Sequence, residues 1–309
     1  MSEQVIQTEQ EKEMHPILKW FSRNSIQLIF GIVIAFWCIL YVGFFVWGVI
    51  SSFKDPVGFA MDPIGISLNP IDWAPNNYIT ALQAIKKILP SGETVFLPTM
   101  LWNSLLYCVG NALFPNIMLC FATYIVNKYK HFRWTQILWV IFVITNYVPF
   151  NSDLGSELKM LRAFEMYNTM WGNWIYNCGA FGAGFLLYLG CWRSISNTYI
   201  EAAEIDGAGP LTMFFKVMFP QTMGLLLVLF LTRFSGLWND YMSMLIYIPG
   251  YPTIASGAFE FQFSVEPGAS DITVKLAGLF AFSLPVMLMY FMMRSKLVKA
   301  MSMAGGLKG

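Results

Sequence analysis

Long apolar segments dominate this chain and restrict the folds that it can adopt. A helix needs about 20 mainly apolar residues to cross a bilayer, and irregular backbone is not tolerated against lipid. With 56% hydrophobic and 12% charged residues, the composition is that of a membrane protein rather than a soluble domain. The sequence therefore predicts an all-α polytopic membrane protein with six transmembrane helices. The predicted spans are residues 26–51, 99–126, 134–151, 170–192, 223–248 and 273–293.

Polar segments divide the chain around these spans. Residues 1–25 are predicted to form a cytoplasmic tail, and residues 52–98 an external loop that its aromatic residues keep ordered. Residues 294–309 are basic and glycine-rich and are predicted to form a second cytoplasmic tail. Between them, residues 99–293 form a predicted five-helix core that contains a polar stretch at 199–220.

Positive charge indicates the orientation of these spans. Lys and Arg gather on the cytoplasmic side of membrane proteins. If the amino terminus lies inside, about twelve of the 19 Lys and Arg residues are cytoplasmic and about six are external, while Arg233 lies within a span. This distribution predicts that both termini and the 199–220 stretch are cytoplasmic.

Polar residues inside the second predicted span indicate which of its faces is buried. Asn103, Asn111, Pro115 and Asn116 would be costly against lipid. We therefore expect them to face protein or a cavity.

Several kinds of chemistry are disfavoured by the sequence. The five cysteines fall in apolar segments without paired spacing, which is typical of small buried side chains rather than of disulfides or metal ligands. The two histidines are too far apart for a metal cluster, and the net charge of +1 gives no indication of a nucleic-acid partner. The sequence also lacks the GxxxxGK[ST] phosphate loop.

The polar stretch begins with Glu201-Ala202-Ala203, which is followed after three residues by Gly207 and later by Pro220. Residues 201–205 are mostly good helix formers. Gly207 and the Gly209-Pro210 pair should end that helix and form a sharp turn. Pro210 suits the first position of a second helix that leads into the membrane.

This spacing resembles the EAA loop of the permease subunits of bacterial ATP-binding-cassette (ABC) importers. Two further segments resemble the carbohydrate branch of that family, and the resemblance extends over about residues 100–309. These segments are Ile205-Asp206-Gly207-Ala208 and Trp238-Asn239-Asp240-Tyr241. The resemblance implies a type I ABC importer permease fold with a cytoplasmic coupling helix, similar to the maltose-type second permease subunit, in the bacterial inner (plasma) membrane.

The resemblance also implies the partners of the chain. They are a second permease subunit that forms a heterodimer with it, two ATPase subunits that bind ATP and Mg²⁺, an extracytoplasmic sugar-binding protein, a sugar substrate and membrane lipid. The chain itself would bind no cofactor and would be the non-catalytic subunit of an ATP-hydrolysing transporter.

Residue roles in the coupling loop follow from the same resemblance. Glu201 would be the polar anchor toward an ATPase subunit, and the small Ala202 and Ala203 would let the helix seat closely. Gly207 would permit the turn. Pro220 completes the loop motif.

A substrate pathway is predicted in the fifth span. Arg233 and Asp240 are seven residues apart, which would place both on one face of a continuous helix. Ionisable residues inside a membrane indicate function. Trp238 and Asn239 could stack on a sugar ring and bind its hydroxyls. The alternative is that Arg233 and Asp240 only hold helices together.

Three other functions remain open on the sequence alone. A secondary transporter or channel would work without ATP, but no inverted repeats are evident. A membrane enzyme would need clustered ionisable residues at the membrane face. An ABC importer permease for a non-sugar solute is the nearest alternative, and Arg233 keeps an acidic oligosaccharide possible.

Overall fold

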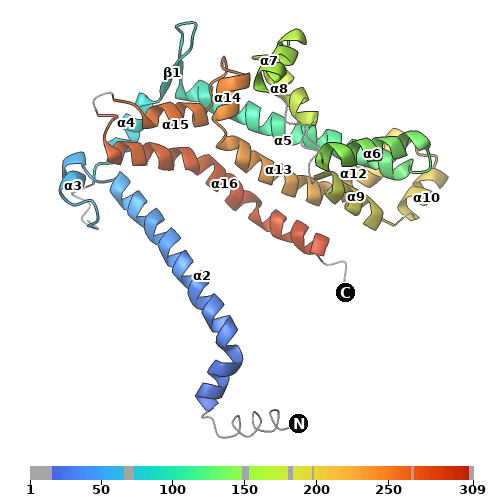
Figure 1. Cartoon of the computed structure of the whole chain (residues 1–309), viewed down its shortest axis with the longest axis horizontal. Helices are drawn as coiled ribbons and strands as arrows, with labels where there is room; N and C mark the ends of the chain where they lie inside the picture. Colours follow the sequence, from blue (N-terminus) through green and yellow to red (C-terminus); the bar gives the residue numbers. More distant parts are fainter. Residues whose placement is uncertain are drawn as a thin grey trace. The chain divides into compact units, whose positions relative to one another are not determined.

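The computed structural model describes most of the chain as helices in two compact units (Figure 1). The described residues are 16–65, 73–147, 153–179, 184–196, 198–265 and 268–305. The first unit comprises Met1–Asn77 and Asp271–Ala277, and the second comprises Tyr78–Ser270 and Gly278–Gly309.

The first unit contains α2 (Pro16–Ser52) and the short helix α3 (Pro56–Met61). Within α2, Ile26–Ser52 has a mean hydropathy of 2.6 and is long and apolar enough to cross a membrane. This segment matches the first predicted span. The polar residues that follow it are ordered by Asn77, whose side-chain amide donates to the backbone oxygens of Ser52 at 2.9 Å and Lys54 at 2.8 Å.

The second unit is built around α5 (Leu97–Lys128), the long helix that contains the second predicted span. Figure 1 shows α5 alongside the other helices of this unit, and it packs most extensively against α13 and α9. Its neighbours are α6 (Arg133–Tyr147), α8 (Met170–Tyr176), α9 (Gly184–Ser194), α13 (Met223–Trp238) and α15 (Ile254–Gln262).

The polar residues of α5 are buried, as the sequence predicts. The Asn103 amide donates to the backbone oxygen of Pro252 at 3.0 Å. The Asn116 amide donates to the backbone oxygen of Leu226 at 3.0 Å, and its own oxygen accepts from the Tyr188 hydroxyl at 2.6 Å. Buried polar groups cost free energy unless they are bonded. These asparagines therefore fix α5 against distant parts of the chain.

The prediction of six continuous spans needs correction. Among the described residues, three helices are long and apolar enough to cross a membrane, and a bent pair could be a fourth. The third predicted span is described as α6 up to Tyr147, and its residues 148–151 lie outside the described residues. The fourth is described as α8, the 3₁₀ turn η2 (Asn177–Gly179) and α9, and its residues 180–183 lie outside the described residues.

The fifth predicted span is divided. Its first helix, α13, follows Pro210–Gln221 with a bend of 69° and ends at Trp238. A further short helix, α14 (Met242–Tyr247), begins after Asn239-Asp240-Tyr241. The last helix, α16 (Ile272–Gly305), contributes to both units and continues past the predicted end of the sixth span.

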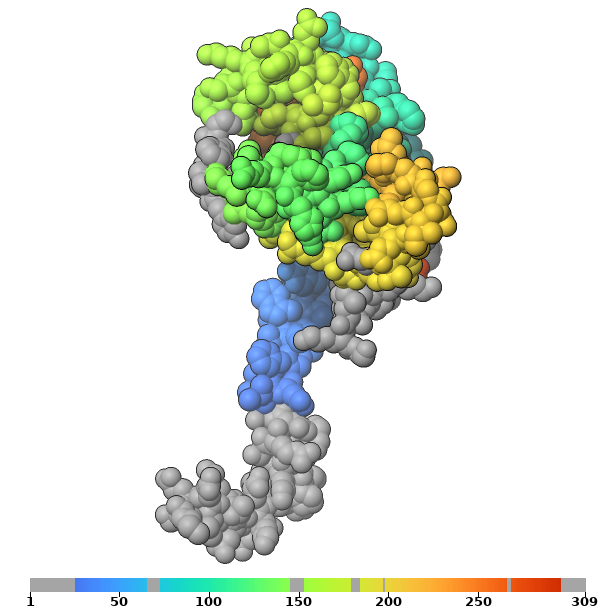
Figure 2. Space-filling model, turned by 90° about the vertical axis from the view of Figure 1, so that its right-hand side faces the viewer, coloured from blue at the N-terminus to red at the C-terminus, as the bar shows by residue number. Residues whose placement is uncertain are grey.

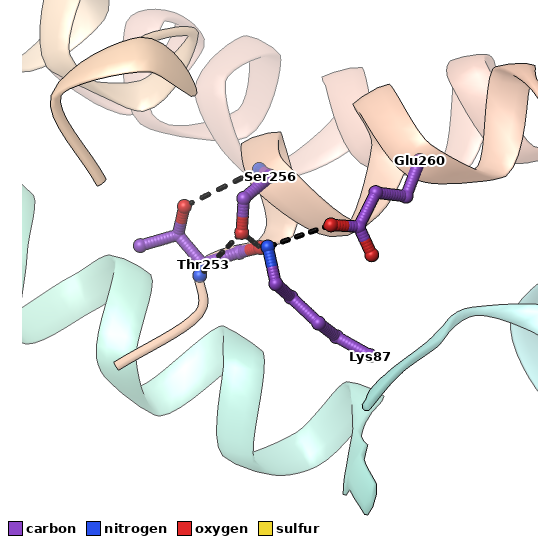
Figure 3. A network of polar contacts seen from close by, with 4 residues as sticks. All are labelled: Lys87, Thr253, Ser256 and Glu260. Carbon is purple, nitrogen blue, oxygen red and sulfur yellow. Dashed lines mark hydrogen bonds and ion pairs between the residues drawn. The ribbon is translucent and has the colours of Figure 1, made fainter. Parts of the chain in front are cut away.

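The region between residues 76 and 96 departs from the all-α prediction. After α4 (Asn76–Ala84), β1 (Lys86–Ile88) and β2 (Thr94–Phe96) form an antiparallel hairpin. Lys87 on β1 makes a 2.7 Å ion pair with Glu260 on α15, beside the capping box formed by Thr253 and Ser256 (Figure 3). Between the third and fourth predicted spans lies the helix α7 (Leu154–Ala163), which buries Leu161.

Candidate functional site

The EAA segment forms α10 (Thr198–Ile205), a helix of eight residues. Only Ala203 is buried in it, with 8% of its surface exposed. Glu201 and Ala202 are exposed, as is Ile205, which is 86% exposed. The helix thus packs against the rest of the unit through Ala203 and the half-buried Ile200, while Glu201, Ala202 and Ile205 face outward.

The carboxyl end of α10 is closed by a Schellman turn. The Ala208 amide donates to the Ala203 oxygen at 2.9 Å, and the Gly207 amide donates to the Glu204 oxygen at 3.1 Å. Gly207 has φ +73°, the left-handed conformation that residues with a Cβ adopt only at a cost. The turn predicted at Gly207 is confirmed, and the structure gives its physical reason.

The chain then re-enters the unit through α11 (Pro210–Thr212), the π-helical segment η3 (Met213–Met218) and α12 (Phe219–Gln221). Pro210 lies in the first turn of its helix, as predicted. Because Pro220 has no amide hydrogen, it cannot donate the α-helical hydrogen bond to the residue four positions earlier. A π-helical turn just before it is consistent with that missing bond. No feature of the sequence predicted this irregularity.

An aromatic cluster anchors this re-entrant segment to α5 and α9. Phe214 is 1% exposed, and its ring centroid lies 5.0 Å from that of Tyr124 on α5 and 6.4 Å from that of Trp192 on α9. The Trp192 indole donates to Thr123 at 3.0 Å, which fixes the indole in turn. The segment after α10 is therefore packed against two longer helices.

A second, weaker contact joins α10 to α5. Lys128, at the end of α5, lies 3.5 Å from Glu204, whose side chain is 56% exposed. Such a solvated pair contributes little to stability. Within the described residues, the Glu201 carboxylate has no ion-pair partner, so its charge is available to another molecule.

Exposed apolar side chains lie on α10 and on the segment that follows it. Residues near 200–220 lie on the face turned to the viewer in Figure 2, in yellow and light orange. The large apolar residues exposed here are Tyr199, Ile205, Leu211 and Phe215. An outward helix with one free carboxylate and an apolar rim has the composition of a protein-binding surface.

The predicted pathway residues separate into two groups. Arg233 lies on α13, whereas Asp240 lies beyond the end of that helix, so the prediction that both share one helical face is wrong. Asp240 accepts from the Tyr107 hydroxyl at 3.1 Å and from the Ser243 amide at 3.0 Å. These bonds hold the chain where α13 gives way to α14.

Arg233 belongs to a separate polar chain between helices. Its guanidinium donates to the Asn177 side-chain oxygen at 3.3 Å. The Asn177 amide donates to the side-chain oxygen of Asn111 at 2.9 Å, and Asn111 is fully buried on α5. This series of hydrogen bonds links α13, η2 and α5.

Trp238 and Asn239 line a cavity of about 300 Å³. Tyr241 and Phe259 stack in its wall with ring centroids 4.2 Å apart and an interplanar angle of 8°. Trp238 is only 5% exposed, and its indole donates to the Phe282 oxygen at 3.2 Å, so it mainly packs.

Sequence reasoning missed some of the cavity. Tyr241 is the last residue of the Trp-Asn-Asp-aromatic motif, so the motif could have identified it as a cavity residue. Phe259 and Gln262 lie on α15, between the predicted spans 223–248 and 273–293, and had no such signal.

Comparisons with known proteins agree on the family of the chain. The model of a family described as "Binding-protein-dependent transport system inner membrane component" matches residues 121–295, more than half of the sequence. The osmoprotective compounds uptake permease protein GgtD of Synechocystis sp. is 26% identical over 208 residues, which cover 67% of this chain and 69% of GgtD. The maltodextrin transport system permease protein MdxG of Bacillus subtilis is 26% identical over 210 residues, which cover 67% of this chain and 74% of MdxG.

A solved structure shows the same fold. It is the crystal structure of a bacterial ABC transporter involved in the import of the acidic polysaccharide alginate. One of its chains superposes with a TM-score of 0.72 at 16% identity, covering 89% of this chain and 97% of that chain.

Substituting Gly207 with alanine should loosen α10, whereas the same change at Gly209 should not. A Cβ at either position would meet nothing within 4 Å, so the pair separates backbone strain from steric contact. Only Gly207 has positive φ, and we expect a cost of roughly 1–2 kcal/mol there. Hydrogen exchange of the Asp206, Gly207 and Ala208 amides should then be about five- to thirtyfold faster in Gly207→Ala than in Gly209→Ala. Equal exchange in the two variants would show that the left-handed turn does not stabilise the helix.

Proposed function

Because the chain belongs to the family of binding-protein-dependent transport system inner membrane components, we propose that it is a permease subunit of an ABC importer that carries saccharides. As a family member it is a non-catalytic membrane subunit whose transport is driven by ATP on partner subunits. The proposal further states that the substrate is a sugar, that α10 couples the chain to the ATPase, and that both termini are cytoplasmic. The proposed partners are a second permease subunit, two ATPase subunits and an extracytoplasmic binding protein.

The observation that carries the coupling role is the geometry of α10. A short helix with one buried side chain is exposed to a partner at Glu201 and Ile205, and it is closed by the Gly207 turn. The segment after it is held by Phe214. A helix of this kind can move with a docked subunit as a rigid body.

In this mechanism the ATPase subunit binds α10 through charge and apolar contact. Glu201 pairs with a cationic group, and the small Ala202 lets the helix approach the subunit closely. Ala203 instead faces the permease, where it is buried. When ATP closes the ATPase subunits, the displacement passes through Phe214 to α5 and α9, and from α5 to α13.

The substrate part of the proposal rests on the cavity beside Tyr241. Aromatic faces and a few amide groups suit a sugar, which has apolar ring faces and polar edges. Tyr241 and Phe259 supply the aromatic wall, and Asn239 and Gln262 supply amides. Relatives named for maltodextrins support a saccharide.

Arg233 has a different role in this proposal. It is held by Asn177 rather than directed into the cavity described above. A charge inside a membrane protein must be bonded or hydrated. We assign Arg233 to the polar chain that joins α13 to α5 and that must rearrange when these helices move.

Truncation of Glu201 should uncouple the ATPase subunit. Losing one partner of a buried charged pair costs about 2–5 kcal/mol, so Glu201→Ala should weaken association with the ATPase at least thirtyfold and abolish uptake. Co-purification with the partner subunits, followed by uptake in reconstituted vesicles, measures both effects. Glu93→Ala removes an equally exposed carboxylate from the β1–β2 turn and should change neither. Normal association and uptake in Glu201→Ala would contradict the coupling role.

Two aromatic residues of the motif should behave differently. Tyr241→Leu removes a ring from the cavity wall and should lower sugar uptake roughly two- to tenfold, while Tyr241→Phe keeps the ring and the uptake. Trp238→Phe removes the bond to Phe282 and should lower the free energy of unfolding in detergent by about 1 kcal/mol. Uptake by Tyr241→Leu equal to that of the unchanged protein would exclude this cavity from the substrate pathway.

A further inference from the structure

A second cavity, of about 170 Å³, lies where α5, α6 and α9 meet. It is close to α10, because α9 leads into α10 and the end of α5 carries the Lys128–Glu204 pair. Neither the family assignment nor the coupling role uses this cavity. Its lining includes Lys130, Thr135, Gln136, Trp139, Leu189 and Arg193.

Two cations border the cavity. Lys130 and Arg193 are exposed, and within the described part of the chain neither has an acidic partner, whereas the neighbouring Lys128 is paired. The Gln136 side chain donates to the Lys130 backbone oxygen at 3.4 Å, which holds this part of the loop on α6. The cavity is therefore electropositive.

The interior of the cavity is largely apolar. Leu189 is 4% exposed and forms part of the lining. Trp139 contributes another wall, and its ring packs against Phe185 at 5.5 Å. The border of the cavity is polar, and its inner walls are apolar and aromatic. This combination suits an amphipathic ligand better than a fully hydrated ion.

An exposed apolar surface on α6 adjoins the cavity. Ile137, Leu138, Val140 and Ile141 are each about half exposed, and they follow directly from the cavity residues Thr135 and Gln136. In a membrane protein such a surface meets acyl chains. With α6 embedded in the membrane, the cavity lies at the level of the lipid headgroups.

We propose that this cavity binds the phosphate of an anionic glycerophospholipid, with Lys130 and Arg193 on the phosphate and the acyl chains along α6. Basic pockets between membrane helices are suited to anionic headgroups, and Arg binds phosphate with paired hydrogen bonds. Free phosphate shares this chemistry but would make no use of the apolar surface of α6. The bound lipid would hold α6 against α9, next to the segment that contains α10.

Native mass spectrometry of the purified transporter complex tests this proposal. The complex is incubated with phosphatidylglycerol, with phosphatidylcholine, or with inorganic phosphate alone. The double variant Lys130→Gln/Arg193→Gln should bind phosphatidylglycerol about 25-fold more weakly, since each basic residue near an anionic surface contributes about fivefold. Binding of phosphatidylcholine should not change.

Two further double variants show whether a loss of lipid binding comes from the site itself or from misfolding. Lys130→Arg/Arg193→Lys preserves both charges and should retain the lipid. Lys159→Gln/Arg162→Gln removes two exposed cations from α7 and should also retain it. Undiminished phosphatidylglycerol binding by Lys130→Gln/Arg193→Gln would overturn the site. Binding of inorganic phosphate that competes with the lipid at equal concentration would overturn its assignment to a lipid.

Discussion

The placement of Phe214 against Tyr124 and Trp192 is the interaction on which the proposed transport mechanism depends. An isolated helix of eight residues is not stable in water, and α10 buries only Ala203. The π-helical segment η3 that follows α10 packs against it and helps to position it. Buried aromatic pairs contribute about 0.5–1.5 kcal/mol beyond their area, and Phe214 makes such contacts with both α5 and α9. The free face of α10 can then remain exposed to a partner.

The asparagines of α5 extend this connection through the second unit. Asn116 is bonded to α13 and to Tyr188 of α9, and Asn111 is bonded through Asn177 to Arg233. Each amide would be costly to bury without these partners. Helix α5 is thus a rigid intermediary between the re-entrant segment at one end and the polar chain around Arg233. Small residues alone would pack these helices but would not define their register.

The sequence was informative wherever local chemistry decides the structure. Apolar length predicted the first and second spanning helices closely, and Gly207 and Pro210 predicted the turn after α10 because their backbone preferences are intrinsic. The break in the fifth predicted span could not be found in this way. At this break the Tyr107 hydroxyl, which is distant in sequence, donates to Asp240 after α13 has ended.

The candidate sites also differ in how far the sequence could identify them. The residues from Glu201 to Pro220 lie in one contiguous motif, so a resemblance could identify them together. The aromatic wall around Tyr241 needs Phe259, which comes from α15, and the pairing of these rings is visible only after folding. Trp238, a motif position that suggested sugar stacking, also lines this cavity, but it is largely buried and donates to the Phe282 oxygen.

The central claim is that the exposed face of α10 binds the ATPase subunit on the cytoplasmic side. Its most direct test is a single cysteine at Ile205, which is 86% exposed, in a background without the native cysteines. A membrane-impermeant maleimide should label this cysteine in inverted vesicles but not in intact cells, and bound ATPase subunits should block the labelling. A cysteine at Glu93 should show the opposite sidedness and no protection. Labelling of Ile205→Cys from outside, or equal labelling with and without the ATPase subunits, would contradict the claim.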